Sequence, residues 1–125
     1  MGTEIVIGDD DEPSFEVDDD LETVIEEIGG WGFLCRGGEV TYTGYLVPVS
    51  GLSSFAESAE ALAEQYGDEA RAWSYEREIV HADGRTETRS WSITGLQLRG
   101  LMLDLAATAR GAARRQQGIV LNMDD

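Results

Sequence analysis

Apolar and polar residues alternate along two neighbouring segments, 73–79 and 90–94, and this alternation predicts a β-hairpin. A two-residue Asp83-Gly84 turn would oppose Trp73 to Thr94 and separate the apolar faces of the two strands. A three-residue loop, 82–84, instead opposes Trp73 to Ile93 and Tyr75 to Trp91. We therefore predict the longer loop, with Gly84 at the positive-φ position that glycine adopts most easily.

A second hairpin is predicted upstream, over residues 31–36 and 39–47, with Gly37-Gly38 as a two-residue turn. This register opposes Cys35 to Val40 and Phe33 to Tyr42. The apolar phase shifts after Gly44, which indicates a bulge there. Cys35 falls on the apolar face, so we expect a buried structural thiol rather than a reactive one.

Three stretches show the i, i+3, i+4 spacing of amphipathic helices, over about 19–28, 53–66 and from about 96 to 115. Asp18, Asp19 and Asp20 suit the start of the first helix, and capping competes there with a metal or ligand role. Ser54 and Glu57 have the spacing of a capping box for the second helix. The expected core positions are Leu21, Val24, Ile25, Ile28, Leu52, Phe55, Ala56, Ala59, Leu62, Ala63, Tyr66, Leu98, Leu101, Met102, Leu105, Ala109 and Ala112, with Leu96 and Leu103 broadening the third face.

The two hairpin-helix units resemble each other at an offset of 44 residues, since Val49-Ser50-Gly51-Leu52 parallels Ile93-Thr94-Gly95-Leu96. We therefore expect an α+β domain over 18–116, in the order α-β-β-α-β-β-α, with a four-stranded antiparallel sheet and helices on one face. Residues 1–17 are expected to form an acidic arm or linker, and residues 117–125 an arm or short strand. The apolar ends, 5–7 and 119–121, either pair with the protein's own sheet or add strands to a neighbouring subunit.

Charge separates the N-terminal part of the chain from the rest. The 125 residues carry a net charge of −16, and residues 1–30 hold twelve acids and no base. This concentration indicates a contact surface for a basic protein, with a solvated acidic tail as the alternative. The predicted partner-binding residues are Asp9, Asp10, Asp11, Glu12, Asp18, Asp19, Glu22 and Glu26.

Several kinds of chemistry are disfavoured by composition. The chain has a single cysteine, Cys35, and a single histidine, His81, so an internal disulfide is excluded and thiol–imidazole pairs are limited to one. We expect no metal, no cofactor and no catalysis. The net charge repels phosphate, which argues against direct nucleic-acid binding despite Arg110, Arg114 and Arg115, whose cations suit the end of the third helix. No apolar run is long enough to span a membrane, and the first residues lack a signal-peptide pattern, so we expect a cytoplasmic location or one within a viral particle.

These patterns favour a non-catalytic protein-binding or assembly protein, such as a small acidic adaptor, a chaperone-like protein or a virion-type subunit. The order of elements and the acidity are similar to those of small secretion-chaperone domains, in architecture alone. The alternative is a phage- or plasmid-type inhibitor that mimics nucleic acid on a DNA- or RNA-binding enzyme. A homo-oligomer formed through an edge strand is a further expectation.

Overall fold

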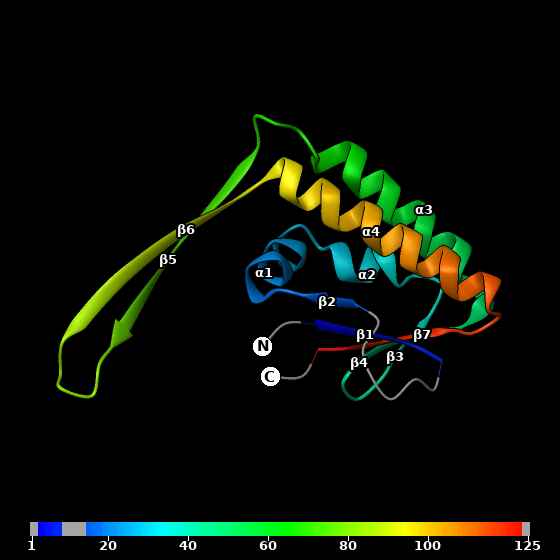
Figure 1. Cartoon of the computed structure of the whole chain (residues 1–125), viewed down its shortest axis with the longest axis horizontal. Coiled ribbons are helices and arrows are strands. Elements are labelled where there is room, and N and C mark those ends of the chain that lie inside the picture. The colour runs from blue at the N-terminus through cyan, green and yellow to red at the C-terminus, as the bar shows by residue number, and fades with distance from the viewer. Residues whose placement is uncertain (1–2, 9–14, 124–125) are drawn as a thin grey trace.

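The fold combines a five-stranded antiparallel sheet, four helices and a separate two-stranded hairpin within the described residues (Figure 1). The structure is a computed structural model and describes residues 3–8 and 15–123. Its elements are β1 (Thr3–Ile7), β2 (Phe15–Val17), α1 (Asp19–Glu27), α2 (Gly30–Leu34), β3 (Glu39–Val40), β4 (Gly44–Val47), α3 (Val49–Tyr66), β5 (Ala72–Val80), β6 (Thr86–Thr94), α4 (Gly95–Arg114) and β7 (Ile119–Asn122). The predicted α+β class with antiparallel strands is confirmed, while the order of elements differs.

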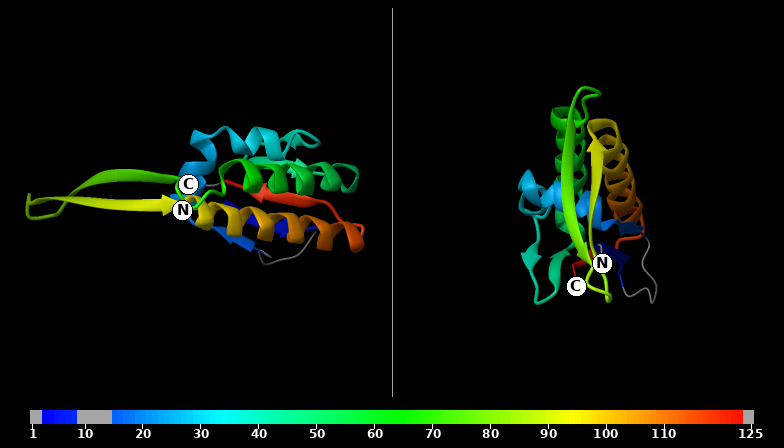
Figure 2. Two further views of the ribbon diagram at one scale, coloured as in Figure 1. Left: turned by 90° about the horizontal axis from the view of Figure 1, so that it is seen from above. Right: turned by 90° about the vertical axis from the view of Figure 1, so that its left-hand side faces the viewer.

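The main sheet has the strand order β2-β1-β7-β4-β3, so β7 lies at its centre between β1 and β4. The helices cover one face of this sheet, as two views of the molecule show (Figure 1, Figure 2). Side chains on that face are buried, including Ile5 and Leu121, which are opposed in neighbouring strands. The other face carries half-buried Val6 and Val120 and exposed Glu4. This alternation is typical of an antiparallel sheet with one face in solvent.

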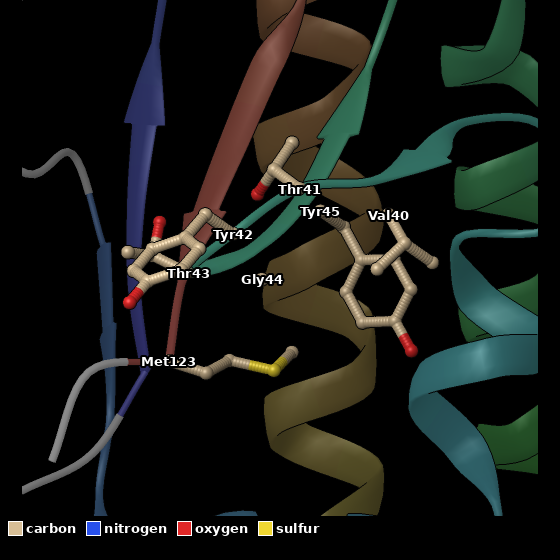
Figure 3. A pocket seen from close by; sticks show the side chains of 7 residues that line it. All are labelled: Val40, Thr41, Tyr42, Thr43, Gly44, Tyr45 and Met123. Atoms are coloured by element: carbon tan, nitrogen blue, oxygen red, sulfur yellow. The ribbon is translucent and has the colours of Figure 1, made fainter.

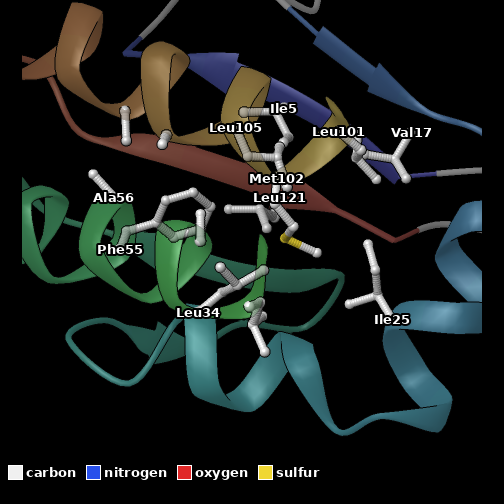
Figure 4. Packing of buried hydrophobic residues seen from close by; sticks show 14 of the residues in the cluster. Ile5, Val17, Ile25, Leu34, Phe55, Ala56, Leu101, Met102, Leu105 and Leu121 are labelled. Carbon is white, nitrogen blue, oxygen red and sulfur yellow. The ribbon is translucent and has the colours of Figure 1, made fainter. Parts of the chain in front are cut away.

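The hydrophobic core fills the space between the sheet and the helices (Figure 4). The apolar stripe of α3 is buried as predicted, except that Tyr66 is half-buried. The main stripe of α4 is also buried as predicted. Leu96 and Leu103 are 51% and 45% exposed, so the expectation that they broaden the buried face of α4 was wrong. The larger helices α3 and α4 lie side by side, which buries their facing alanines.

Strands β5 and β6 form a hairpin that projects from the body of the protein (Figure 1, Figure 2), and we call residues 72–94 the arm. The predicted register is confirmed, because Trp73 opposes Ile93 and Tyr75 opposes Trp91. The loop is also confirmed: Gly84 has φ +88°, and its N–H donates to the His81 carbonyl at 2.9 Å. The arm forms its own two-stranded sheet, so the expected single four-stranded sheet was wrong.

The predicted hairpin around Gly37-Gly38 was also wrong. Residues 30–34 are helical, and Trp31 and Leu34 are buried on the inner side of that helix while Phe33 is 37% exposed. The strands that do pair are β3 and β4, with Val40 opposite Tyr45 rather than Cys35. Gly37 instead packs against the start of α3, where a Cβ on Gly51 would lie 2.5 Å from the Gly37 carbonyl oxygen.

The helix starts differ from the sequence expectation. Helix α3 begins at Val49, ahead of Ser54, and no side chain caps it, so the expected capping box there was wrong. A capping box is present instead at α4, where Thr94 Oγ1 accepts from the Gln97 N–H at 3.2 Å and Gln97 Oε1 accepts from the Thr94 N–H at 2.8 Å. Helix α1 begins at Asp19 as predicted, but the Asp18 side chain makes no capping hydrogen bond.

Both apolar ends of the chain pair within its own sheet. β1 pairs with β2 on one side and β7 on the other, and β7 also pairs with β4. Ile119 and Leu121 are fully buried. Of the two alternatives for these segments, the structure therefore shows pairing with the protein's own sheet.

Candidate partner-binding surface

The predicted partner-binding residues that the structure describes gather on α1 and the residue before it. Asp18 immediately precedes the helix, and Asp19, Glu22 and Glu26 follow one another at spacings of three and four residues. Such positions lie on one side of a helix. Asp9, Asp10, Asp11 and Glu12 lie outside the described residues. Helix α1 also carries Asp20 and Glu27 and contains no basic residue, so all of its charged side chains are acidic.

Glu22 occupies the most crowded position of this acidic surface. Burial raises the pKa of its carboxyl, the Thr3 hydroxyl opposes that rise, and repulsion from Glu26 and Asp19 adds to it. Thr3 is fully buried on β1. The contact between Thr3 and Glu22 is loose, because neither Thr3 Oγ1 nor Glu22 Oε2 meets full hydrogen-bond geometry with any group in the described ranges. A nearby cation would therefore relieve the repulsion at Glu22.

The arm is joined to α1 by a contact that the sequence did not indicate. The Tyr75 hydroxyl donates a hydrogen bond of 2.7 Å to Glu27 Oε2. Partial burial, the hydrogen bond and the Glu27 charge together raise the pKa of Tyr75 to about 12. The Tyr75 ring stacks on Trp91, with 5.6 Å between ring centroids and 28° between planes. The apolar alternation identified this face, but the partner of the tyrosine hydroxyl depends on how α1 packs.

The outer half of the arm is exposed and carries charges of both signs. Arg77 and Arg89 are directly opposed across the two strands. Glu87 accepts from His81 Nε2 at 3.0 Å and from Arg89 Nε at 3.4 Å, and these contacts lower the pKa of its carboxyl. At the tip, Arg85 Nε donates to Asp83 Oδ2 at 2.6 Å. Unlike α1, this half of the arm is therefore close to electrically balanced.

An apolar groove of about 420 Å³ lies at the turn between β3 and β4 (Figure 3). Tyr42 and Tyr45 lie on opposite sides of Gly44, with Met123 extending between them. Tyr42 is fully exposed and Val40 is 78% exposed. No charged side chain lines this groove, so its surface offers apolar and aromatic contact rather than acid-base chemistry.

Arg110, in the C-terminal part of α4, has a structural contact. Arg110 donates to Glu60 Oε1 of α3 at 2.5 Å, which lowers the pKa of Glu60 and raises that of Arg110. Arg110 and Arg114 line a groove of about 320 Å³ together with Val49, Leu52, Ser53 and Ala113. This ion pair between exposed side chains joins the two long helices, and it explains Arg110 without an anionic ligand.

The cysteine and histidine occupy unlike environments. Cys35 follows α2 and is 4% exposed, as expected for a structural thiol, and burial raises its pKa to about 12. His81 directly follows β5 and lies next to the tip of the arm. In the described part of the chain, no group of three or more His, Cys, Asp or Glu side chains could hold a metal ion. No helix of that part is long and apolar enough to cross a membrane.

Comparison with known proteins gave no match to a family model, to a curated protein or to a solved structure.

Proposed function

We propose that this chain is a non-catalytic protein-binding or assembly protein whose acidic N-terminal part contacts a basic protein surface. The observation that carries the proposal is the row of carboxylates on α1. Asp19, Glu22 and Glu26 share one side of a helix that has no basic residue. Their mutual repulsion contributes to the raised pKa of Glu22. A cationic partner would replace this repulsion with attraction, and the acidic field would speed its encounter with the protein.

Two further features support binding rather than catalysis. The single thiol is buried with a raised pKa, which disfavours the nucleophilic thiolate. The single imidazole contacts Glu87 on an exposed hairpin, away from both grooves described above. General acid-base catalysis needs a titratable group held in a cleft beside the substrate. Neither residue meets that requirement, so a binding role accounts for the surface better.

The test removes charge from α1 without disturbing its buried side. The variant Asp19→Asn, Asp20→Asn and Glu26→Gln changes three acids of α1 and leaves the half-buried Glu22 in place. The matched control, Glu57→Gln, Glu64→Gln and Glu69→Gln, removes the same charge elsewhere on the surface. Quantitative pull-downs from the source cell at low and high salt should recover a basic protein with the wild type and the control. The α1 variant should recover much less of that protein.

Equal recovery with both variants would show that α1 is not the contact surface. Weakening by salt is expected, because attraction between exposed charges is largely screened beyond about 8 Å at physiological ionic strength, and at shorter distances as salt is added. Competition by duplex DNA adds a second result. A partner displaced by DNA normally binds nucleic acid, which would favour the inhibitor that mimics nucleic acid. A partner that DNA does not displace favours an adaptor or assembly role.

A further inference from the structure

We propose that two copies of this chain pair through the exposed edge of β6, antiparallel and about a two-fold axis at Thr88, to form a four-stranded sheet from two arms. This proposal is independent of the acidic surface on α1. It begins from the topology of the arm, in which β5 and β6 pair only with each other among the described residues. Each of these nine-residue strands therefore has one edge that pairs with no other strand of the described residues. Isolated two-stranded hairpins are only marginally stable in water, and added strands stabilise them.

The direction of the backbone groups on β6 follows from the hydrogen bonds at the tip. The His81 N–H donates to the Arg85 carbonyl at 2.8 Å, so Arg85 directs its carbonyl toward β5. Because this direction alternates along an antiparallel strand, Glu87 and Arg89 also point inward. Thr86, Thr88 and Ser90 consequently direct their N–H and C=O groups outward. These three residues are exposed, so their backbone groups are available to a second strand.

The sequence of β6 is complementary to itself about Thr88. An antiparallel copy related by a two-fold axis at this residue places Thr88 against Thr88 and Thr86 against Ser90, all with outward backbone groups. Between these pairs, Glu87 of one copy faces Arg89 of the other, at positions where Cα atoms of opposed residues lie about 4.5 Å apart. Opposite charges and paired hydroxyl side chains stabilise antiparallel neighbours.

The residues at both ends of the contact between the two β6 strands also fit this register. Arg85 of one copy faces Trp91 of the other, a pair that can make a cation–π contact. Gly84, the loop residue just before Arg85 in the chain, then lies opposite Ser92 of the second copy. Helix α4 of that copy begins only at Gly95. The strands can therefore pair over the length from Arg85 to Trp91 while the two bodies lie at opposite ends of the new sheet.

The two neighbouring registers on β6, and a central axis on the β5 edge, are disfavoured by charge. An axis at Glu87 or at Arg89 would oppose each of these residues to its own copy. On β5, an axis at Arg77 would oppose Arg77 to itself and Glu76 to Glu78. Like charges directly opposed across strands are destabilising. Pairing through the outer part of the arm also lets two copies of a chain of net charge −16 meet without bringing their acidic α1 helices together.

The first test is the mass of the full chain, measured by sedimentation velocity from micromolar to millimolar concentrations. We expect a reversible dimer. Thr88→Pro should raise its dissociation constant by about tenfold or more, since it removes an outward N–H at the centre of the contact. Proline is tolerated in an edge strand when the lost N–H faces outward, so the hairpin should persist. Glu78→Pro, directly across the arm from Thr88, makes the same change on the β5 edge and should leave the dimer intact.

Charge exchange gives the decisive test. Glu87→Arg and Arg89→Glu should each be monomeric alone, because each opposes like charges at both contacts. Their mixture should form a mixed dimer, in which both contacts are again opposite in charge. Circular dichroism checks that each variant is folded. A monomeric wild type, equal weakening by both proline variants, or failure of the mixture to dimerise would overturn the proposal.

The dependence on salt distinguishes the proposed dimer from the proposed binding of a basic partner. Added salt should preserve or strengthen the dimer, because it screens repulsion between the acidic bodies. The same salt should weaken binding of a basic partner to α1. The variant that lacks three charges on α1 should still dimerise. The Thr88→Pro variant should still bind the basic partner through the α1 surface of each monomer. Failure of one proposal therefore leaves the other standing.

Discussion

Tyr75 and Glu27 join the arm to α1 through a hydrogen bond of 2.7 Å between the tyrosine hydroxyl and Oε2 of the carboxylate. The two residues lie 48 positions apart in the sequence, and the tyrosine ring also stacks on Trp91. This polar contact and the aromatic packing beside it therefore help to fix the base of the arm against α1.

Replacing Tyr75 with Phe should loosen the base of the arm. The ring and its stacking on Trp91 remain, while the hydrogen bond to Glu27 is lost, so we expect a cost of about 1 kcal/mol. Amide hydrogen exchange should become faster along β5 and β6, with less change in α3 and α4. Tyr42→Phe is the matched control, because Tyr42 is fully exposed. Unchanged exchange in the arm of the Tyr75 variant would contradict the role assigned to the hydrogen bond.

The same tyrosine predicts a loss of stability at high pH. The pKa of Tyr75 is raised from an ordinary value of 10.0 to about 12, so folding favours the protonated hydroxyl. Its contribution is fully present below pH 10 and is lost as the pH rises through about 12. Urea unfolding of the wild type across this range should show the decrease, and the Phe variant should show less of it. A titration of Tyr75 near pH 10, followed by NMR, would contradict the prediction.

Glu22→Gln should stabilise the protein at neutral pH. The pKa of Glu22 is raised by burial and by repulsion from Glu26 and Asp19, so folding favours its protonated form. That favourable contribution is present below the ordinary value of 4.5 and is lost as the pH rises through the folded value. A neutral amide avoids the loss, and we expect a gain of about 0.5 kcal/mol after solvent screening.

The gain should shrink as the pH falls below 4.5, which distinguishes a charge effect from improved packing. Denaturant unfolding at several pH values measures it. Glu64→Gln on the exposed side of α3 serves as the control and should change stability little. A stability loss in the Glu22 variant at neutral pH would show that the contact with Thr3 outweighs the repulsion.

Leu121→Ala should destabilise the whole protein. Leu121 is fully buried at the centre of the sheet, opposite Ile5 on one side and Tyr45 on the other. Removing a buried leucine side chain costs about 3 kcal/mol, because a cavity is left. Val120→Ala, on the half-buried outer face of the same strand, should cost about 1 kcal/mol. Thermal unfolding compares the two, and equal effects would contradict the assignment of the inner face.

Cys35 should react slowly with thiol reagents in the folded protein. Raising its pKa from 9.0 to about 12 lowers the thiolate fraction near neutral pH about a thousandfold, and burial further restricts access. A chromogenic disulfide reagent should label the thiol rapidly only after urea is added. Rapid labelling of the native protein would show that α2 opens readily, since Cys35 immediately follows that helix.

The arm was predictable because its two strands carry long, unambiguous alternation. Only one loop length places Trp73 opposite Ile93, so local sequence determines the register. The long apolar stripes of α3 and α4 were predictable for the same reason. Residues 31–35 were not, because the spacing of Trp31, Leu34 and Cys35 fits a helix as well as alternation fits a strand. Such a short segment is decided by packing rather than by its own pattern.

The pairing of distant strands lies beyond what local patterns contain. Nothing in the apolar runs 5–7 and 119–121 indicates that they are neighbours, although each is consistent with a strand. For the candidate surface, too, some features could be predicted from local sequence and others could not. The acids of α1 were found from charge alone, whereas the contact of Tyr75 with Glu27 and the burial of Thr3 beside Glu22 required the packed structure.

The central place of β7 has a consequence for how the chain is made. During synthesis, β4 emerges about 70 residues before the strand that pairs with it in the middle of the sheet, and β1 emerges earlier still. At ~5–20 residues per second, β1 and β4 wait roughly 4 to 14 seconds or longer on the ribosome for their common neighbour. The helices between them can form in that interval from local contacts. The nascent chain therefore passes through a stage with formed helices and uncovered strand edges, when it is most exposed to aggregation and most dependent on chaperones.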